Sequence, residues 1–231
     1  MNEFSVVNPK TRIWGLLFTC LLGISLALTL LPSIHSFYTF LEPFIPAHPF
    51  GDPKLLEMSL FCSASALLYL SIPEKFRSSS DVSSSLKSIL PSFFIPILIA
   101  FLFGWIQRHQ FLVMSQNRVR DLFWFTVCIP IGEELLFRGW LWALMQALFK
   151  KQFFSLTNPL PIELVLSSFA FSLWHTQNYG HVSLGFLVFQ LLYTLLTGFW
   201  LGYVRWKTGK ILVSTLAHTS INLAASLPMI L

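Results

Sequence analysis

Residues 122–149 constrain the fold of this chain more than any other stretch. They form an apolar run long enough to cross a bilayer, yet Glu133, Glu134 and Arg138 lie near its middle. A lone charge at the bilayer centre costs at least ~2.5–3.5 kcal/mol, so each of these groups needs a partner inside the protein. Because unpaired backbone groups are also costly in lipid, we expect helices that pack around this stretch and enclose it.

The spacing of the charges indicates how they pair. On a helix of about 100° per residue, Glu134 and Arg138 share one face and can form an ion pair. Glu133 points elsewhere and has no partner nearby in the sequence. Pro130 lacks an N–H, so it frees the carbonyl of Thr126 and predicts a kink or a water-filled cavity. A purely structural ion pair with a protonated Glu133 is the plainer alternative, but ionisable groups at this depth are typical of functional sites.

Composition defines the class of protein. Hydrophobic residues make up 55% of the 231 residues and charged residues 11%, whereas soluble domains carry about a quarter charged residues. We therefore expect an all-α polytopic membrane protein, a single integral membrane domain (1–231) of about seven or eight transmembrane helices with a polar intramembrane cavity. The basic residues are spread over short loops, which argues against nucleic acid as a partner. The cysteines (Cys20, Cys62 and Cys128) each fall within an apolar run and are expected to be small buried side chains.

The apolar runs predict the topology. The first lacks a clear small-residue cleavage site, so we expect it to be a span rather than a signal peptide. Residues 107–121 mix basic and apolar side chains and predict a surface segment or a re-entrant eighth element. The Lys and Arg residues of the loops, Arg205 among them, predict a cytoplasmic N-terminus. We expect the membrane to be a prokaryotic inner or plasma membrane. Generic spans are expected in 1–121 and a motif-bearing core in 122–231. The predicted spans are 13–31, 55–72, 89–106, 122–149, 162–175, 182–204 and 211–231.

Two further polar pairs lie within the later apolar runs. Phe171 precedes His175 by one helical turn, and His218 and Asn222 share one helix face. Alone, each has an ordinary explanation, as an interfacial histidine or as a hydrogen bond between helices. Together with the two glutamates they predict a single polar site inside the bundle.

These residue types fit more than one chemistry. A carboxylate and a histidine can polarise a water, while a second histidine and an amide can donate hydrogen bonds to an oxyanion. That set would hydrolyse an amide bond. The same Glu and His side chains can instead hold zinc with a position open for water. A third possibility is a non-catalytic membrane binding protein that keeps these residues for packing.

The three motifs, in this order within apolar runs, resemble the CPBP family of CAAX proteases and bacteriocin-processing enzymes. They are Glu-Glu-x-x-x-Arg at 133–138, Phe-x-x-x-His at 171–175 and His-x-x-x-Asn at 218–222, and the resemblance covers about residues 122–225. It implies an intramembrane endopeptidase in the lipid bilayer that cuts a membrane-anchored protein or peptide. The alternative within such a family is a bacteriocin-immunity or scaffold protein without activity.

The resemblance also implies roles for the residues. It implies a glutamate-type protease without a catalytic metal, with zinc kept as the alternative. The implied catalytic residues are Glu133 and His175, which would activate the water, and His218 and Asn222, which would bind the oxyanion; Glu134 and Arg138 would support them as the ion pair that orients the motif helix.

Overall fold

The computed structural model describes residues 53–71, 89–107, 118–149, 160–179 and 182–230. Within these ranges the chain is helical and contains no strand beyond an isolated bridge between Tyr179 and Val182. The all-helical fold is therefore confirmed for this part of the chain. The predicted span 13–31 and most of the 107–121 segment lie outside the described residues, so the number of spans stays a prediction.

The helices coincide with the predicted apolar runs that fall within the described residues. Helix α10 continues past the expected end at residue 204 and brings Arg205 into its last turn. The elements are α2 (Pro53–Ser71), η2 (Leu90–Phe93), α5 (Phe94–Gln107), α6 (Arg118–Phe123), η3 (Trp124–Cys128), α7 (Ile129–Glu134), η4 (Leu135–Leu141), α8 (Trp142–Phe149), α9 (Ile162–Trp174), η5 (His175–Asn178), α10 (Leu184–Thr208) and α11 (Ile211–Ile230).

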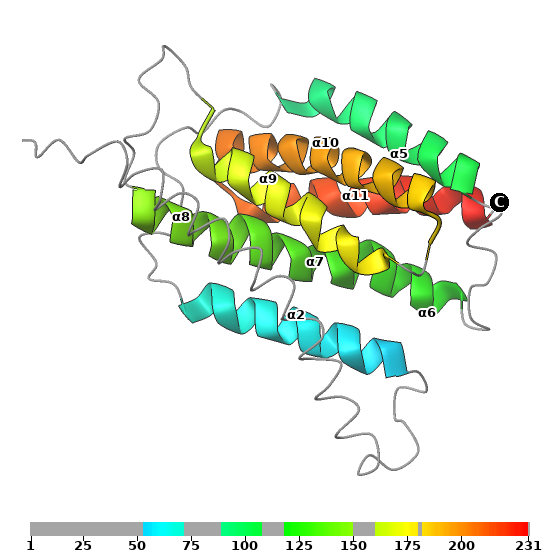
Figure 1. The fold of residues 1–231 in the computed structure, drawn as a ribbon, viewed down its shortest axis with the longest axis horizontal. Helices are drawn as coiled ribbons and strands as arrows, with labels where there is room; N and C mark the ends of the chain where they lie inside the picture. The colour runs from blue at the N-terminus through cyan, green and yellow to red at the C-terminus, as the bar shows by residue number, and fades with distance from the viewer. Residues whose placement is uncertain (1–52, 72–88, 108–117, 150–159, 180–181, 231) are drawn as a thin grey trace, which may run out of the picture.

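The helices lie side by side in one bundle (Figure 1). The segment from α6 to α8 is one irregular rod through its middle, in which η3 and η4 are π-helical. Helix α2 packs against α7 and η4 on one side of the rod. Helices α9 and α11 contact the rod on the other side (Figure 1). The turn that carries the two glutamates is thus enclosed by helices from both ends of the described sequence.

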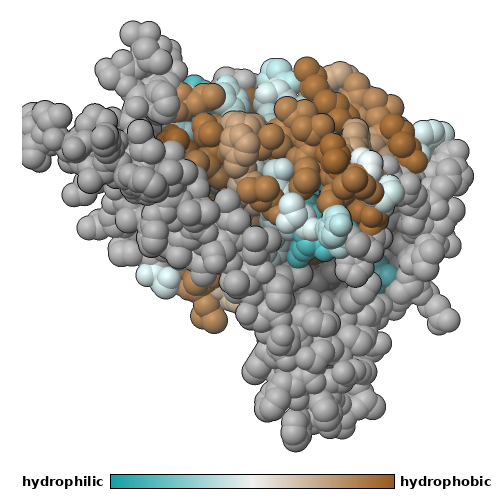
Figure 2. Space-filling model, viewed as in Figure 1, coloured by the Kyte–Doolittle hydropathy of each residue, from teal (hydrophilic) through white to brown (hydrophobic). Residues whose placement is uncertain are grey.

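Within the described residues, two helices are long and apolar enough to cross a membrane, Leu184–Thr208 and Ile211–Pro228. Figure 2 shows a broad apolar surface on the upper right of the molecule. Large hydrophobic side chains are exposed along the outer helices, as a lipid-facing surface requires. Examples are Phe94, Ile95 and Ile106 on α5, Leu192 and Leu196 on α10, and Leu212 and Leu216 on α11.

Close packing fixes the helices that surround the rod. A Cβ atom at Gly104 of α5 would overlap the carbonyl of Ala225 on α11, so these helices meet backbone to backbone. On the other side, the Phe137 ring of η4 packs edge-on against Phe171 and Trp174 of α9, with ring centroids 5.4 and 6.0 Å apart. These contacts hold the rod against α9 at the level of the charged turn.

Candidate active site

The rod changes its hydrogen-bond register just before the glutamates. At the end of η3, the N–H of Ile129 donates to the carbonyl of Trp124, five residues back. It passes over Phe125, which would be its acceptor in an α-helix. In the π register the residue opposite the Phe125 carbonyl is Pro130, which has no N–H. Pro130 was expected to free the Thr126 carbonyl of an α-helix; with the π-turn before it, the Phe125 carbonyl also lacks the N–H groups of Ile129 and of residue 130.

A side chain from α11 binds this freed carbonyl. The Asn222 amide donates from Nδ2 to the Phe125 oxygen at 3.0 Å. The bond ties α11 to the rod about two helical turns before the glutamates. Asn222 therefore has a defined partner in the structure, which sequence reasoning did not foresee.

The second π-helical segment ends in the same way. At the end of η4, the N–H of Trp142 donates to the carbonyls of Phe137 and Gly139, and so passes over Arg138. The Arg138 carbonyl accepts instead from Nε of Arg205 on α10, at 3.3 Å. The two carbonyls that are passed over at the ends of η3 and η4 are thus bound by side chains of the two C-terminal helices.

Glu134 and Arg138 form the ion pair that their spacing predicts. Nη1 of Arg138 donates to Oε1 of Glu134 at 3.0 Å, and both side chains have no exposed surface. Nη2 of Arg138 donates to the carbonyl of Gly198 on α10 at 3.2 Å. The guanidinium also lies over the ring of Phe171, 4.3 Å from its centroid.

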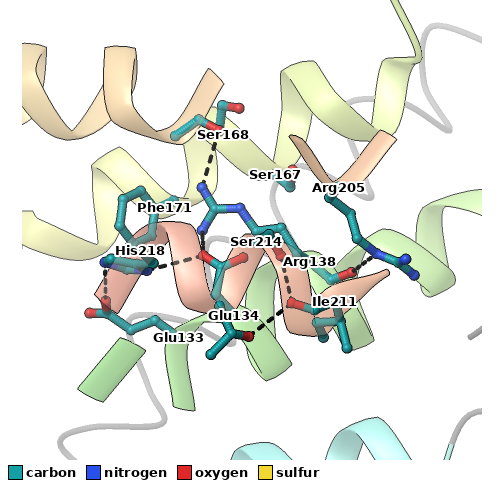
Figure 3. Close-up of polar contacts among 12 residues, drawn as sticks. Glu133, Glu134, Arg138, Ser167, Ser168, Phe171, Arg205, Ile211, Ser214 and His218 are labelled. Atoms are coloured by element: carbon teal, nitrogen blue, oxygen red, sulfur yellow. Dashed lines mark hydrogen bonds and ion pairs between the residues drawn. The ribbon is translucent and has the colours of Figure 1, made fainter. Parts of the chain in front are cut away.

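His218 of α11 lies between the two glutamates (Figure 3). Its Nδ1 is 3.1 Å from Oε1 of Glu134, and its Nε2 is 3.6 Å from Oε2 of Glu133. His218 is 3% exposed and Glu133 is 6% exposed. Glu133, which has no partner nearby in the sequence, therefore faces a histidine from the last helix.

His175 adjoins the cluster through an aromatic ring. It begins η5 at the end of α9, and its Nδ1 lies 2.9 Å from the carbonyl of Phe171. A carbonyl can only accept, so Nδ1 carries the hydrogen and Nε2 keeps a lone pair in the neutral ring. The Phe171 ring packs edge-on against both histidines, with centroids 5.1 Å from His175 and 5.6 Å from His218.

Sequence reasoning missed the role of Arg205. It was placed in a cytoplasmic loop, but the side chain is buried, with 2% exposed, in the last turn of α10. Gly209 at the end of that helix has φ 67°, the left-handed conformation in which many helices end. Reading this glycine as the helix end would have placed Arg205 inside α10.

The remaining polar candidates are simpler. Cys62 and Cys128 are free thiols, and Sγ of Cys62 donates to the carbonyl of Cys128 at 3.1 Å. Both are only half-buried, and Cys20 lies outside the described residues. Across the described ranges, no three His, Cys, Asp or Glu side chains are arranged so that they could share one metal ion.

Comparison with known proteins adds a family. Residues 115–224, which include all three motifs, match the family described as Rce1-like, type II CAAX prenyl endopeptidase. No curated protein and no solved structure matches the chain. The family is membrane-embedded and acts on membrane-associated protein substrates. Residues 115–224 therefore form an Rce1-like domain of the CPBP family, and the chain is a protease.

Proposed function

We propose that the protein is an intramembrane endopeptidase that cuts a peptide bond near the membrane end of an anchored protein or peptide. Water activated by Glu133 and His175 is the nucleophile. The observation that carries the proposal is the buried cluster in which one histidine, His218, faces Glu133 with one ring nitrogen and Glu134 with the other. A packing role would need one ion pair and does not account for the second glutamate.

The contacts of His218 support its role as an oxyanion donor. Oε1 of Glu134 accepts from Arg138 and also faces Nδ1 of His218, so Nδ1 carries a hydrogen. A second proton on Nε2 makes the His218 ring a cation. The carboxylates of the two glutamates are then balanced by His218 and Arg138. The Nε2–Oε2 distance of 3.6 Å to Glu133 is longer than a hydrogen bond, so this N–H can turn to a reacting oxygen.

The other residues complete a balanced hydrolysis. Nε2 of His175 accepts a hydrogen bond from one O–H of the water and orients it, and this O–H stays intact. Glu133 takes the other hydrogen as a proton while the oxygen attacks the carbonyl carbon. The tetrahedral oxyanion is bound by His218 and by the second N–H of Asn222, since the first is used by Phe125. Glu133 then gives its proton to the leaving nitrogen as the C–N bond breaks.

We also propose the membrane arrangement that this chemistry needs. The chain forms one integral membrane domain over residues 1–231, with seven or eight spans and a polar cavity at bilayer depth around Glu133. The N-terminus faces the cytoplasm of a prokaryotic membrane, although the burial of Arg205 removes one cation from the loops that favour this orientation. The two long apolar helices α10 and α11 support the bilayer location.

Replacing the proposed base tests the function. Glu133→Gln keeps the size of the side chain but cannot accept the proton, so we expect the cleavage rate to fall at least ~10²-fold. The purified protein in nanodiscs would be given a fluorogenic farnesylated peptide. Glu163→Gln, at the start of α9 and outside the cluster, is the matched control and should keep the wild-type rate. Wild-type cleavage by Glu133→Gln would refute the proposed role of Glu133.

A further inference from the structure

Arg205 is a buried cation that the proposed mechanism does not use. Arg205 is 2% exposed, and a buried guanidinium is stable only where its N–H groups find acceptors. Nε of Arg205 donates to the carbonyl of Arg138, and Nη1 donates to the carbonyl of Gly209. One side chain thus joins the charged rod to the turn between α10 and α11.

The Arg138 carbonyl needs this donor because of the π-helix. The N–H of Trp142 is used by Phe137 and Gly139, so it does not reach the Arg138 oxygen, which it would bind in an α-helix. An unpaired carbonyl inside an apolar bundle is unfavourable. Without Arg205, the rod can satisfy this oxygen by returning to α-helical register at Trp142.

That change of register would move the glutamates. A π-turn holds one more residue than an α-helical turn, and its loss rotates the preceding residues by about 100° relative to the following helix. Glu133 and Glu134 precede η4, whereas α8 follows it. The rotation would turn both carboxylates away from His218.

Arg205 also contacts the turn that leads into the helix of His218, the partner of the glutamates. Its second acceptor, Gly209, ends α10 in the left-handed conformation, and the N–H of Gly209 donates back to the Arg205 carbonyl at 2.9 Å. Helix α11, which carries His218, starts two residues later at Ile211. The same guanidinium therefore contacts the segment that carries the carboxylates and the turn from which the histidine helix starts.

We propose that Arg205 is a positioning residue for catalysis, which holds η4 in its π register and keeps Glu133 and Glu134 aimed at His218. This inference rests on the proposed function of the same site. It is distinct from the ion pair of Arg138, because Arg205 acts through a backbone carbonyl rather than through a carboxylate.

The test compares variants within one helical turn. Arg205→Met keeps an apolar side chain of similar length but has no donor, while Arg205→Lys keeps the charge and one donor group. Lys207→Met is the matched control, because Lys207 carries the same charge in the same turn and stacks on the rings of Trp206 and Tyr203. Each variant is measured for kcat and KM on the farnesylated peptide and for hydrogen exchange across the rod.

Arg205→Met should lower kcat by ~10- to 100-fold with little change in KM, since misplaced catalytic groups lose rate rather than binding. Its amide exchange should rise in residues 135–142 and stay unchanged elsewhere. Arg205→Lys should recover part of both effects, and Lys207→Met should match the wild type.

Two results would overturn the inference. One is wild-type kcat and wild-type exchange in Arg205→Met. The other is faster exchange along the whole chain with no recovery in Arg205→Lys, which would indicate a general loss of folding. If Glu133→Gln cleaves at the wild-type rate, the proposed function fails. The exchange data then still test whether Arg205 keeps η4 in its π register. If Glu133→Gln is inactive and Arg205→Met is normal, only the positioning role fails.

Discussion

Breaking the buried Glu134–Arg138 ion pair should lower the free energy of unfolding much more than breaking an ion pair on a protein surface does. Both side chains are fully buried, with Nη1 and Oε1 3.0 Å apart. Removing one partner of a buried pair leaves an uncompensated charge and typically destabilises a protein by ~3–5 kcal/mol. Exposed pairs contribute only about 0–1 kcal/mol. Arg138→Met also removes the donor to the Gly198 carbonyl, so its cost should lie at the upper end.

A double-mutant cycle separates the pair from its surroundings. Glu134→Gln alone leaves Arg138 charged, and Arg138→Met alone leaves Glu134 charged. The double variant leaves neither charge, so its loss of unfolding free energy should be smaller than the sum of the two single losses by several kcal/mol. Gln at position 134 can still accept from Nδ1 of His218, which limits side effects at the histidine.

The assay is reversible unfolding of the purified protein in mixed micelles, followed by circular dichroism, for the wild type and the three variants. Glu163→Gln serves as the control for loss of a carboxylate and should have little effect. Additive losses in the double variant, within about 0.5 kcal/mol, would show that the two charges do not compensate one another. That result would refute the reasoning from burial, whatever the activity of the variants.

The remaining predictions concern activity. The purified enzyme should keep its activity in strong chelators and contain no stoichiometric zinc; activity lost to a chelator and restored by added zinc would replace the glutamate mechanism with a metalloprotease. His175→Ala and His218→Ala should each lower the cleavage rate at least ~10²-fold. Asn222→Ala should do the same and also destabilise the fold by ~1–3 kcal/mol, because the Phe125 carbonyl is left unpaired; unfolding and cleavage measured on the same preparation check both effects.

Much of the fold could be predicted from residue patterns. Apolar runs bounded by polar and basic residues predicted the helices of the described chain, because hydrophobic length alone decides what can cross a bilayer. The pair of Glu134 and Arg138 followed from helix geometry. The polar groups of later runs had to meet Glu133, since no nearby residue could, and His218 does so.

The details that sequence could not supply depend on how the helices pack and on where they end. The spacing of Phe171 and His175 predicted a shared face, but not that the Phe171 ring would contact both histidines and the guanidinium. Arg205 followed an apolar run and preceded Lys207, so it resembled a loop residue. Its burial depends on where α10 ends, which a glycine four residues later determines.

The two π-helical segments explain why the catalytic core needs its last two helices. An α-helix satisfies its own carbonyls, and a chain with Glu133 and Glu134 on a regular helix would need nothing from α10 or α11 for its backbone. Here the N–H groups that end η3 and η4 pass over the carbonyls of Phe125 and Arg138, and Asn222 and Arg205 bind these two oxygens. Part of the energy that stabilises the irregular rod therefore comes from α10 and α11, and α11 also carries His218. Loss of contact with the C-terminal helices would relax the rod toward regular helix and separate the glutamates from the histidine in one step.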